Sequence, residues 1–239
     1  MIKIAVPGVN GRMGQEIAQA VLQTQGVELV LATVRAGNEQ AGKKVANSDV
    51  TIETVISKPS FDVLIDFTLP EGVMEHLAYC REHKKPMVIG TTAFTPEQQA
   101  AIKAAAQEIP IVQAPNMSIG VNVCFKLIAQ AAKMLPDYDL SVIDVHHQHK
   151  KDSPSGTAKN MAQILADSSG QNLEAIEILS HRAGDIVGTH IVTFKNPHEF
   201  ITIGHEAQDR GIFAQGAVLA AKWVGKQKPG LYSMQDVIS

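Results

Sequence analysis

The sequence predicts an α/β protein with two domains, the first built on a parallel sheet and the second an α+β region with an open, mostly antiparallel sheet. Three observations lead to this prediction. Short apolar runs alternate with helical patterns through the first half of the chain, which is the order that gives a parallel sheet wrapped by helices. The pattern changes after about residue 116, and three β-rich runs follow one another closely between residues 175 and 207. A final helical pattern then follows, and we expect it to return to the first domain.

The elements of the first domain are short and regular. Apolar and β-branched runs predict strands at residues 3–7, 28–34, 63–67, 87–90 and 111–114. Between them, apolar residues recur at helical spacing and predict helices at residues 12–25, 72–83 and 96–108. Because the connections are long enough to hold a helix, neighbouring strands are expected to run parallel.

The second domain has a different order of predicted helices and strands. A strand at 140–147 lies between helices predicted at 119–135 and 155–167, and further strands follow at 175–180, 189–195 and 199–207. An alanine-rich helix is predicted at 211–224. We therefore expect residues 1–117 with 211–239 to form one domain and residues 118–210 the other.

The composition excludes several classes of protein. The formal net charge of −3 offers no broad basic field for a nucleic-acid partner. Cys80 and Cys124 are far apart and outside any CxxC spacing, which argues against a disulfide framework or a thiolate zinc site and favours the reducing cytoplasm. The apolar start is interrupted by Lys3, Pro7 and Gly8, so we expect no signal peptide, and no window predicts a membrane span.

A glycine-rich turn lies where the first strand meets the first helix, at Gly8-Val9-Asn10-Gly11-Arg12-Met13-Gly14. Glycine is needed where the backbone turns sharply and approaches a pyrophosphate at a helix N-terminus, because a side chain would block the contact. The GxxGxxG spacing alone also fits a turn that is glycine-rich for steric reasons. Its position after the first strand of an alternating pattern favours dinucleotide binding, and hence a Rossmann-like domain.

The end of the second strand indicates which dinucleotide binds. NAD-specific sites usually offer Asp or Glu to the ribose about twenty residues after the glycines, whereas this chain has Val34 followed by Arg35 and no acid there. Arg35 can pair with a 2′-phosphate, which favours NADPH over NADH; the alternative is a solvated surface arginine. Two more turns, Gly90-Thr91-Thr92 and Ala114-Pro115-Asn116-Met117, end strands at the same edge and are expected to flank the nicotinamide.

The most informative stretch is DVHHQHKKDSPSGTA, residues 144–158. Its histidines titrate near physiological pH, its lysines attract carboxylates, and the helix start at Ser155-Gly156-Thr157 offers backbone N–H groups to an anion. A metal site is one alternative, but adjacent histidines on a strand point to opposite faces, and no carboxylate or cysteine stands at a convincing ligand spacing. Another is one core histidine with two exposed ones. We expect a carboxylate site and no metal.

These motifs resemble those of the dihydrodipicolinate reductase family, also called 4-hydroxy-tetrahydrodipicolinate reductases. The signature HHxHKxDxPSGTA is matched from His146 to Ala158, and the GxxGRMG loop, the GTT turn and the RAGDIVGxH run from Arg182 to His190 also match. The resemblance covers nearly the whole chain in order. Two departures are that Val34 replaces the acid of members with dual cofactor use, and that the segment between residues 167 and 182 is shorter than in longer members.

The resemblance implies an activity and an assembly. It implies a cytoplasmic enzyme of lysine and diaminopimelate biosynthesis that reduces 4-hydroxy-tetrahydrodipicolinate, a cyclic dicarboxylate, to tetrahydrodipicolinate. NADPH is the expected cofactor and NADH a possible one. It also implies a homotetramer assembled through the sheet of the second domain.

The resemblance assigns roles to the matching positions. His146 is similar to the family's proton donor and acceptor, and Lys150 to a second proton donor. The substrate is expected to contact His147, Ser155, Gly156, Thr157 and Arg210. The cofactor is expected to contact Gly8, Val9, Asn10, Gly11, Arg12, Met13, Arg35, Gly90, Thr91, Thr92, Ala114, Pro115, Asn116 and Met117. His149 has no assigned role beyond supporting the local structure.

The implied reaction suits these residue types. Hydride delivery to a conjugated C=C–C=N system leaves an enamine-like anion, which a positioned acid such as His146 or Lys150 must protonate on carbon. Closure of the two domains is expected to exclude water. Two other functions stay open: another two-domain nicotinamide oxidoreductase, such as an aspartate dehydrogenase, and a non-catalytic nucleotide sensor. The complete histidine, lysine and SGT constellation argues against the first, and the presence of both proton donors against the second.

Overall fold

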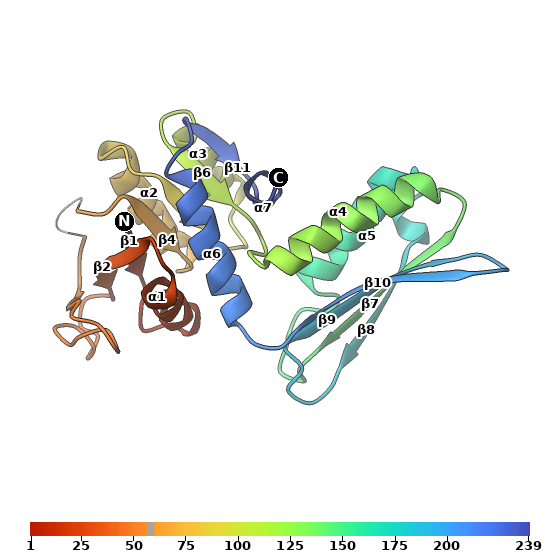
Figure 1. Ribbon diagram of the computed structural model, residues 1–239, viewed down its shortest axis with the longest axis horizontal. Coiled ribbons are helices and arrows are strands. Elements are labelled where there is room, and N and C mark those ends of the chain that lie inside the picture. Colours follow the sequence, from red (N-terminus) through yellow and green to blue (C-terminus); the bar gives the residue numbers. More distant parts are fainter. Residues whose placement is uncertain (57–59) are drawn as a thin grey trace. The chain divides into compact units, whose positions relative to one another are not determined.

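The computed structural model describes residues 1–56 and 60–239, and the chain forms two compact units (Figure 1). Residues 1–118 and 211–239 make up the first unit, and residues 119–210 the second. The division expected from the sequence lies one residue earlier, after residue 117. Within the described residues, no helix is both long and apolar enough to cross a membrane.

Among the residues that the structure describes, the first unit contains a seven-stranded sheet whose strands all run parallel. Their order is β3-β2-β1-β4-β5-β6-β11, so the strand order reverses between β1 and β4. In such sheets ligands bind beyond the carboxyl ends of the strands at the reversal point. The strands are β1 (Ile2–Pro7), β2 (Val27–Thr33), β3 (Ile52–Glu53), β4 (Val63–Asp66), β5 (Met87–Ile89), β6 (Pro110–Gln113) and β11 (Gly230–Tyr232).

Helices cover both faces of this sheet, because alternate strand residues carry apolar side chains to opposite sides. The helices are α1 (Arg12–Gln23), α2 (Pro70–Glu82), α3 (Pro96–Ala105), α6 (Gly211–Val224) and α7 (Met234–Val237). Val63 and Val88 belong to the core shared with α1 and α6. Leu64 and Met87 belong to the core shared with α2 and α3. The helical layers that the alternating pattern predicts are therefore present.

The predicted strands and long helices of this unit are all present; α6 has the predicted bounds, and each of the others has at least one end shifted. Pro70 opens α2 two residues before the predicted start, because proline suits the first turn of a helix. Helix α1 ends at Gln23 and not at residue 25, because Gly26 turns the chain with a φ of +83°. The sequence analysis missed β3, β11 and α7, which are two to four residues long and too short to show an apolar period.

The second unit, described in full, is an open four-stranded sheet with helices on one face (Figure 1). Its strands lie in the order β10-β9-β7-β8, and β9 pairs antiparallel with both β7 and β10, whereas β8 runs parallel to β7. The predicted mostly antiparallel sheet is confirmed. The elements are α4 (Ile119–Met134), β7 (Asp139–His146), α5 (Gly156–Ser169), the 3-10 helix η1 (Leu173–Ala175), β8 (Glu177–Arg182), β9 (Gly188–Lys195) and β10 (Phe200–Ala207).

The face of this sheet opposite α4 and α5 carries a row of apolar side chains. Ile143 pairs with Leu179 on one side and with Ile191 on the other, and Ile191 pairs with Gly204. Ile143 follows Val142, which is buried in the core under the helices, so the row points to the other side. Leu179 is 49% exposed in this chain. The row therefore presents a flat apolar surface.

Candidate active site

Strand β7 delivers two chemically active side chains to the helix-covered face of its sheet. Asp144 and His146 are two residues apart and therefore point to the same side as Leu140 and Val142 of the core. Asp144 is fully buried and His146 is 7% exposed. A charged side chain on a core face must be stabilised by hydrogen bonds or by opposite charge, and groups close to Asp144 provide this stabilisation.

One carboxylate oxygen of Asp144 faces two histidines. Its Oδ1 lies 3.0 Å from Nδ1 of His146 and 3.4 Å from Nε2 of His190. Burial raises the pKa of the carboxyl, but contacts with both histidines and with the backbone N–H of Ser155 hold the pKa of Asp144 far below its usual range. Asp144 is therefore an anion at neutral pH, held against two imidazole rings.

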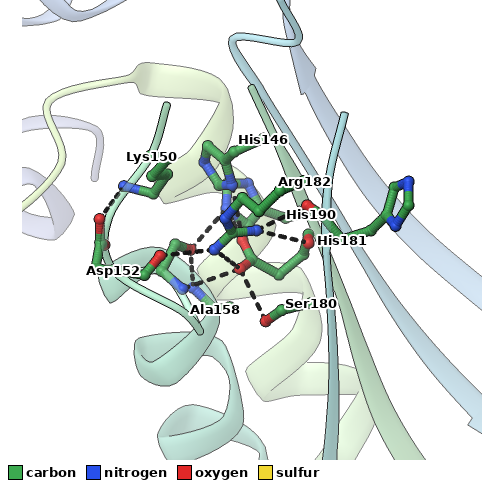
Figure 2. Close-up of polar contacts among 10 residues, drawn as sticks. His146, Lys150, Asp152, Ala158, Ser180, His181, Arg182 and His190 are labelled. Atoms are coloured by element: carbon green, nitrogen blue, oxygen red, sulfur yellow. Dashed lines mark hydrogen bonds and ion pairs between the residues drawn. The ribbon is translucent and has the colours of Figure 1, made fainter. Parts of the chain in front are cut away.

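Arg182 holds the other oxygen of this carboxylate. Oδ2 accepts hydrogen bonds from Nη2 of Arg182 at 3.1 Å, the backbone N–H of Ser155 at 2.9 Å and the hydroxyl of Ser180 at 3.2 Å. Nη2 also donates to the carbonyl of Asp152 at 2.7 Å. Figure 2 shows Arg182 and His190 within this cluster, whereas His181, the neighbour of Arg182, points away from it. The network ties β7, β8 and the start of α5 together.

Asp144, His146 and His190 are also of metal-ligand type, and within the described residues one potential ligand atom of each lies within 4.8 Å of the others. The sequence analysis found no carboxylate at a convincing spacing; this was wrong, because Asp144 stands on the same strand face two residues before His146. Arg182 already brings a positive charge to within 3.1 Å of this carboxylate. The donor set suits an ion-pair network better than a cation, and the absence of a resident metal stays a prediction.

Contacts on both sides fix the orientation of the His146 ring. Nδ1 is buried against Asp144, and Nε2 lies beside Gly188, where an added Cβ would stand 2.9 Å from it. A carboxylate next to one ring nitrogen fixes the orientation and the tautomer of the ring. Nε2 is therefore the ring nitrogen of His146 that does not face Asp144.

The loop after β7 is supported by the loop between β8 and β9. The backbone N–H of His147 donates to the carbonyl of Ile186 at 2.7 Å, and the N–H of Ala183 donates to the carbonyl of His146 at 2.9 Å. The RAGDIVG run, residues 182–188, thus holds the histidine loop by its backbone and leaves space at Gly188 for the His146 ring.

Lys150 lies on the same loop and is paired with Asp152 (Figure 2). Its Nζ is 2.8 Å from Oδ1 of Asp152, and the two side chains are 23% and 54% exposed. Burial opposes ionisation of Asp152, but the hydrogen bond from Lys150 lowers the pKa of Asp152 overall. Because the pair is open to solvent, an incoming carboxylate can replace Asp152 at the ammonium group without breaking a buried ion pair.

The start of α5 is built around Ser155. Its hydroxyl accepts the N–H of Ala158 at 3.1 Å and lies 3.2 Å from Nε2 of His190, while its own N–H goes to Asp144. Ser155 is 2% exposed, whereas Gly156 is exposed and an added Cβ there would meet no atom within 4 Å. The polar groups of Ser155 thus hold the helix start, and Gly156 with the half-buried Thr157 presents it to solvent.

His147 lies in a positive environment. Desolvation lowers the pKa of its ring, and the charge of Arg210 lowers that pKa further, followed by smaller effects from His146, His149 and Lys150. The ring centroids of His147 and His149 are 6.3 Å apart. The second unit therefore gathers His146, His147, Lys150 and Arg210, together with the start of α5, around one loop.

In the first unit, the glycine loop joins β1 to α1. Gly8 has a φ of +66°, a conformation that favours glycine, and the N–H of Gly11 donates to its carbonyl at 2.9 Å. An added Cβ at Gly14 would lie 2.2 Å from that same carbonyl oxygen, so only glycine permits this close packing. Gly11 precedes the helix and provides no side-chain cap. The first N–H groups of α1, from Arg12 and Met13 onward, are suited to hold a pyrophosphate.

The other expected cofactor residues follow β2, β5 and β6. Because these strands are parallel, Arg35, the turn Gly90-Thr91-Thr92 and residues 114–117 follow their strands at the same edge of the sheet as the glycine loop. Arg35 is exposed, whereas Val34 before it is buried in the core.

An acidic residue lies beside the end of the second strand in space, although none directly follows that strand in the sequence. The short strand β3 pairs with β2, and it brings Glu53 into register with Thr33. The carbonyl of Glu53 accepts the N–H of Val34 at 2.9 Å. Glu53 therefore lies beside Val34, the residue before Arg35, although it is far from both in the sequence.

Sequence reasoning left Asp144, Arg182 and His190 without roles. A signal for Asp144 was available, because an acid that alternates with buried Leu140 and Val142 on a strand lies on the core face. No local signal pairs Asp144 with Arg182, which is 38 residues away in the sequence.

Comparison with known proteins covers the whole chain. The chain matches the family model "Dihydrodipicolinate reductase, N-terminus" over residues 2–117 and "Dihydrodipicolinate reductase, C-terminus" over residues 120–238. A 4-hydroxy-tetrahydrodipicolinate reductase of Syntrophotalea carbinolica is 43% identical over 264 aligned positions, which cover 100% of this chain and 99% of that protein.

Solved structures agree with these matches. A dipicolinate-bound dihydrodipicolinate reductase from Paenisporosarcina sp. TG-14 superposes with a TM-score of 0.85 at 27% identity, over 99% of each chain. An aspartate dehydrogenase from Thermotoga maritima superposes with a TM-score of 0.52 at 12% identity, over 95% of this chain and 98% of that one, which shows a shared fold alone. This chain is an oxidoreductase of a kind that uses NAD(P)H. It belongs to the dihydrodipicolinate reductase family.

Proposed function

We propose that this chain reduces 4-hydroxy-tetrahydrodipicolinate to tetrahydrodipicolinate, with NADPH as the preferred cofactor, in diaminopimelate and lysine biosynthesis. One observation carries the proposal: the buried Asp144–His146 pair leaves an acid–base nitrogen on a loop that also holds Lys150 and leads to an open helix start at Gly156. Reduction of a dicarboxylate needs both a proton donor and contacts for anions, and this loop offers both.

In this proposal, residues of the second unit donate the protons. The glycine loop would hold NADPH, which when bound would supply a hydride to the conjugated system of the substrate. The carbon that gains negative charge then takes a proton from Nε2 of His146, whose Nδ1 lies 3.0 Å from Oδ1 of Asp144. Lys150 is the second proton donor. The 4-hydroxyl leaves as water before the reduction, so substrate, NADPH and one proton give product, NADP⁺ and water.

The substrate carboxylates are assigned to the cations and the helix start. His147 and Arg210 contribute positive charge or hydrogen bonds, and Gly156 and Thr157 contribute backbone N–H and hydroxyl groups. Ser155 acts through the geometry of the helix start, because its own groups are hydrogen-bonded within the protein.

Binding of a dicarboxylate should raise the pKa of His147. The free ring has a lowered pKa because of desolvation and the charge of Arg210, and a bound anion stabilises its protonated form. Since the complex then binds more protons than the free chain, affinity should rise as the pH falls through the pKa of bound His147 towards that of free His147, and level off below it. NMR titration of the His147 ring with and without pyridine-2,6-dicarboxylate measures the shift.

The matched variant is His147→Gln, which keeps a hydrogen-bonding side chain but does not titrate in this range. It should lose the part of the pH-dependent affinity that His147 contributes. An identical titration curve for His147 in the free and bound chain would remove this residue from the carboxylate site.

We assign the cofactor to the carboxyl edge of the first sheet. The glycine loop supports this assignment, because its tight packing requires glycine at Gly8 and Gly14 and the first N–H groups of α1 follow it, where they can bind a pyrophosphate. Arg35 is exposed and lies where the 2′-phosphate of NADPH is expected. The turns Gly90-Thr91-Thr92 and 114–117 are assigned to the nicotinamide end.

Arg35→Ala should raise the KM for NADPH by about tenfold or more and leave the KM for NADH within about twofold. The guanidinium interacts with the 2′-phosphate, which NADH lacks, and a charge-assisted pair of this kind is worth roughly 1.5–3 kcal/mol. Steady-state kinetics with each cofactor measure the effect. Lys43→Ala is the control, because Lys43 is an exposed cation in the same connection between β2 and β3. Equal effects of Arg35→Ala on both cofactors would remove the 2′-phosphate contact.

We also infer a cytoplasmic homotetramer that assembles through the sheet of the second unit. The apolar row of Leu179, Ile143 and Ile191 supports this, since Gly204 beside it leaves the surface flat and no helix of this unit covers it among residues 119–210. The buried free thiols of Cys80 and Cys124 are compatible with a reducing compartment.

Calorimetric titration in the presence of NADPH tests the substrate class. Dipicolinate, the planar dicarboxylate named in the Paenisporosarcina structure, should bind this chain, and aspartate should not. The opposite result would favour the aspartate dehydrogenase alternative. The variant Gly156→Ala serves as a local probe: it meets no atom in the free chain, so folding should be unchanged while dipicolinate binds more weakly.

A further inference from the structure

The loop after β4 contains a polar network that the proposed function leaves without a role. Asp66, the last residue of β4, is fully buried. Its Oδ1 accepts both the backbone N–H of Thr68 at 2.8 Å and the hydroxyl of Thr68 at 2.7 Å. Its Oδ2 lies 2.6 Å from Nδ1 of His76 on α2. Thr68 is therefore held by main chain and side chain to one buried carboxylate.

Thr68 in turn touches the loops on both sides of it. An added Cβ at Gly8, in the glycine loop after β1, would lie 2.8 Å from Cγ2 of Thr68. The carbonyl of Thr68 accepts the hydroxyl of Thr91, in the turn after β5, at 2.7 Å. Position 90, next to Thr91, must also be glycine, because a Cβ there would lie 2.2 Å from the ring of Phe67. One residue thus connects the loops after β1, β4 and β5.

These loops are the ones assigned to different parts of the dinucleotide. Gly8 belongs to the loop assigned to the pyrophosphate, and Thr91 to the turn assigned to the nicotinamide. The three strands are adjacent in the sheet, with β4 between β1 and β5 at the point where the strand order reverses. A small movement of Thr68 would therefore change the spacing of two contacts to the same ligand.

We propose that Thr68, held by Asp66 and His76, is a positioning residue that fixes the spacing between the glycine loop and the Gly90–Thr92 turn and thereby sets the affinity for the nicotinamide cofactor. This inference rests on the cofactor assignment of the proposed function. Misplacement of binding groups by about 1 Å is enough to cost orders of magnitude in rate or affinity, so the fixed spacing has a measurable consequence.

The substitutions Thr68→Val and Thr68→Ser test the inference. Valine places a methyl group where the hydroxyl lies 2.7 Å from Asp66, which is too close for a carbon, so the loop must move. Serine keeps both hydrogen bonds to Asp66. We expect the Kd of NADPH, measured by calorimetry without substrate, to rise about tenfold in Thr68→Val and to stay within about threefold in Thr68→Ser. In turnover, KM for NADPH should rise by more than kcat falls.

The outcomes separate this inference from the proposed function. Wild-type NADPH affinity in Thr68→Val, or equal losses in both variants that follow a lowered Tm, would overturn the positioning role while cofactor binding itself stands. No binding of NADPH or NADH by the wild-type chain would overturn both. If Thr68→Val does not fold, His76→Leu and His76→Asn decide: asparagine can still donate to Asp66, so only His76→Leu should weaken NADPH binding, and wild-type affinity in both would contradict the inference.

Discussion

Replacement of His146 by glutamine should lower kcat for the dicarboxylate by about 10²–10⁴-fold, which is the range that general acid–base groups contribute. Glutamine fills similar space but cannot transfer a proton at neutral pH, and it loses the contact of Nδ1 with Asp144 at 3.0 Å. The Kd of NADPH should stay within about twofold, because His146 lies in the second unit and the assigned cofactor residues in the first. Stopped-time turnover assays and calorimetry give the two numbers.

His149→Gln is the control for His146→Gln. It makes the same chemical change on the same loop, but at an exposed side chain, and turnover should change by less than about threefold. Full activity in His146→Gln would show that Nε2 of His146 does not deliver the decisive proton. In that case the buried contact between His146 and Asp144 would have a purely structural function.

Lys150→Ala should lower kcat by about 10²-fold or more, because the second proton donor and a cation for the substrate are lost together. Lys151→Ala, at the exposed lysine next to it, should have little effect and controls for the charge of the loop. Steady-state kinetics at saturating NADPH measure both variants.

Asp152→Asn then distinguishes a direct role of Lys150 from a structural one. Lys150 pairs with Asp152 at 2.8 Å in the free chain, so Lys150→Ala also leaves Asp152 without this partner. If Lys150 acts on the substrate, Asp152→Asn releases the ammonium group and should keep kcat within about threefold. A loss in Asp152→Asn as large as in Lys150→Ala would mean that the pair matters only for the loop.

Sequence patterns predict the main elements of this protein because those elements bury apolar rows. Strands such as Val63–Asp66 and Met87–Ile89 consist almost entirely of buried residues, and their runs stand out against the helical spacing between them. Edge elements do not bury such rows. Strand β3 has two residues and β11 three, so their pairing depends on neighbours that are remote in the sequence.

The sequence likewise predicts only part of the candidate site. The residues that carry chemistry stand close together in the sequence from Asp144 to Thr157, and their types alone predict an anion and proton site. The groups that orient these residues do not stand close to them in the sequence. Arg182 reaches Asp144, and Gly188 makes room for the ring of His146, through strand pairings that no local spacing reveals. For the same reason Glu53 lies beside Val34 although the sequence shows no acid at that point.

One measurement tests the central claim most directly. The substrate is generated by the synthase that precedes this reductase, the purified wild-type chain is added with NADPH, and NADPH absorbance and product mass are followed together. The proposed function predicts that one NADPH is oxidised for each tetrahydrodipicolinate formed, and that His146→Gln slows both by the same factor. No oxidation of NADPH or NADH under these conditions, with the cofactor still bound, would contradict it and favour a nucleotide sensor.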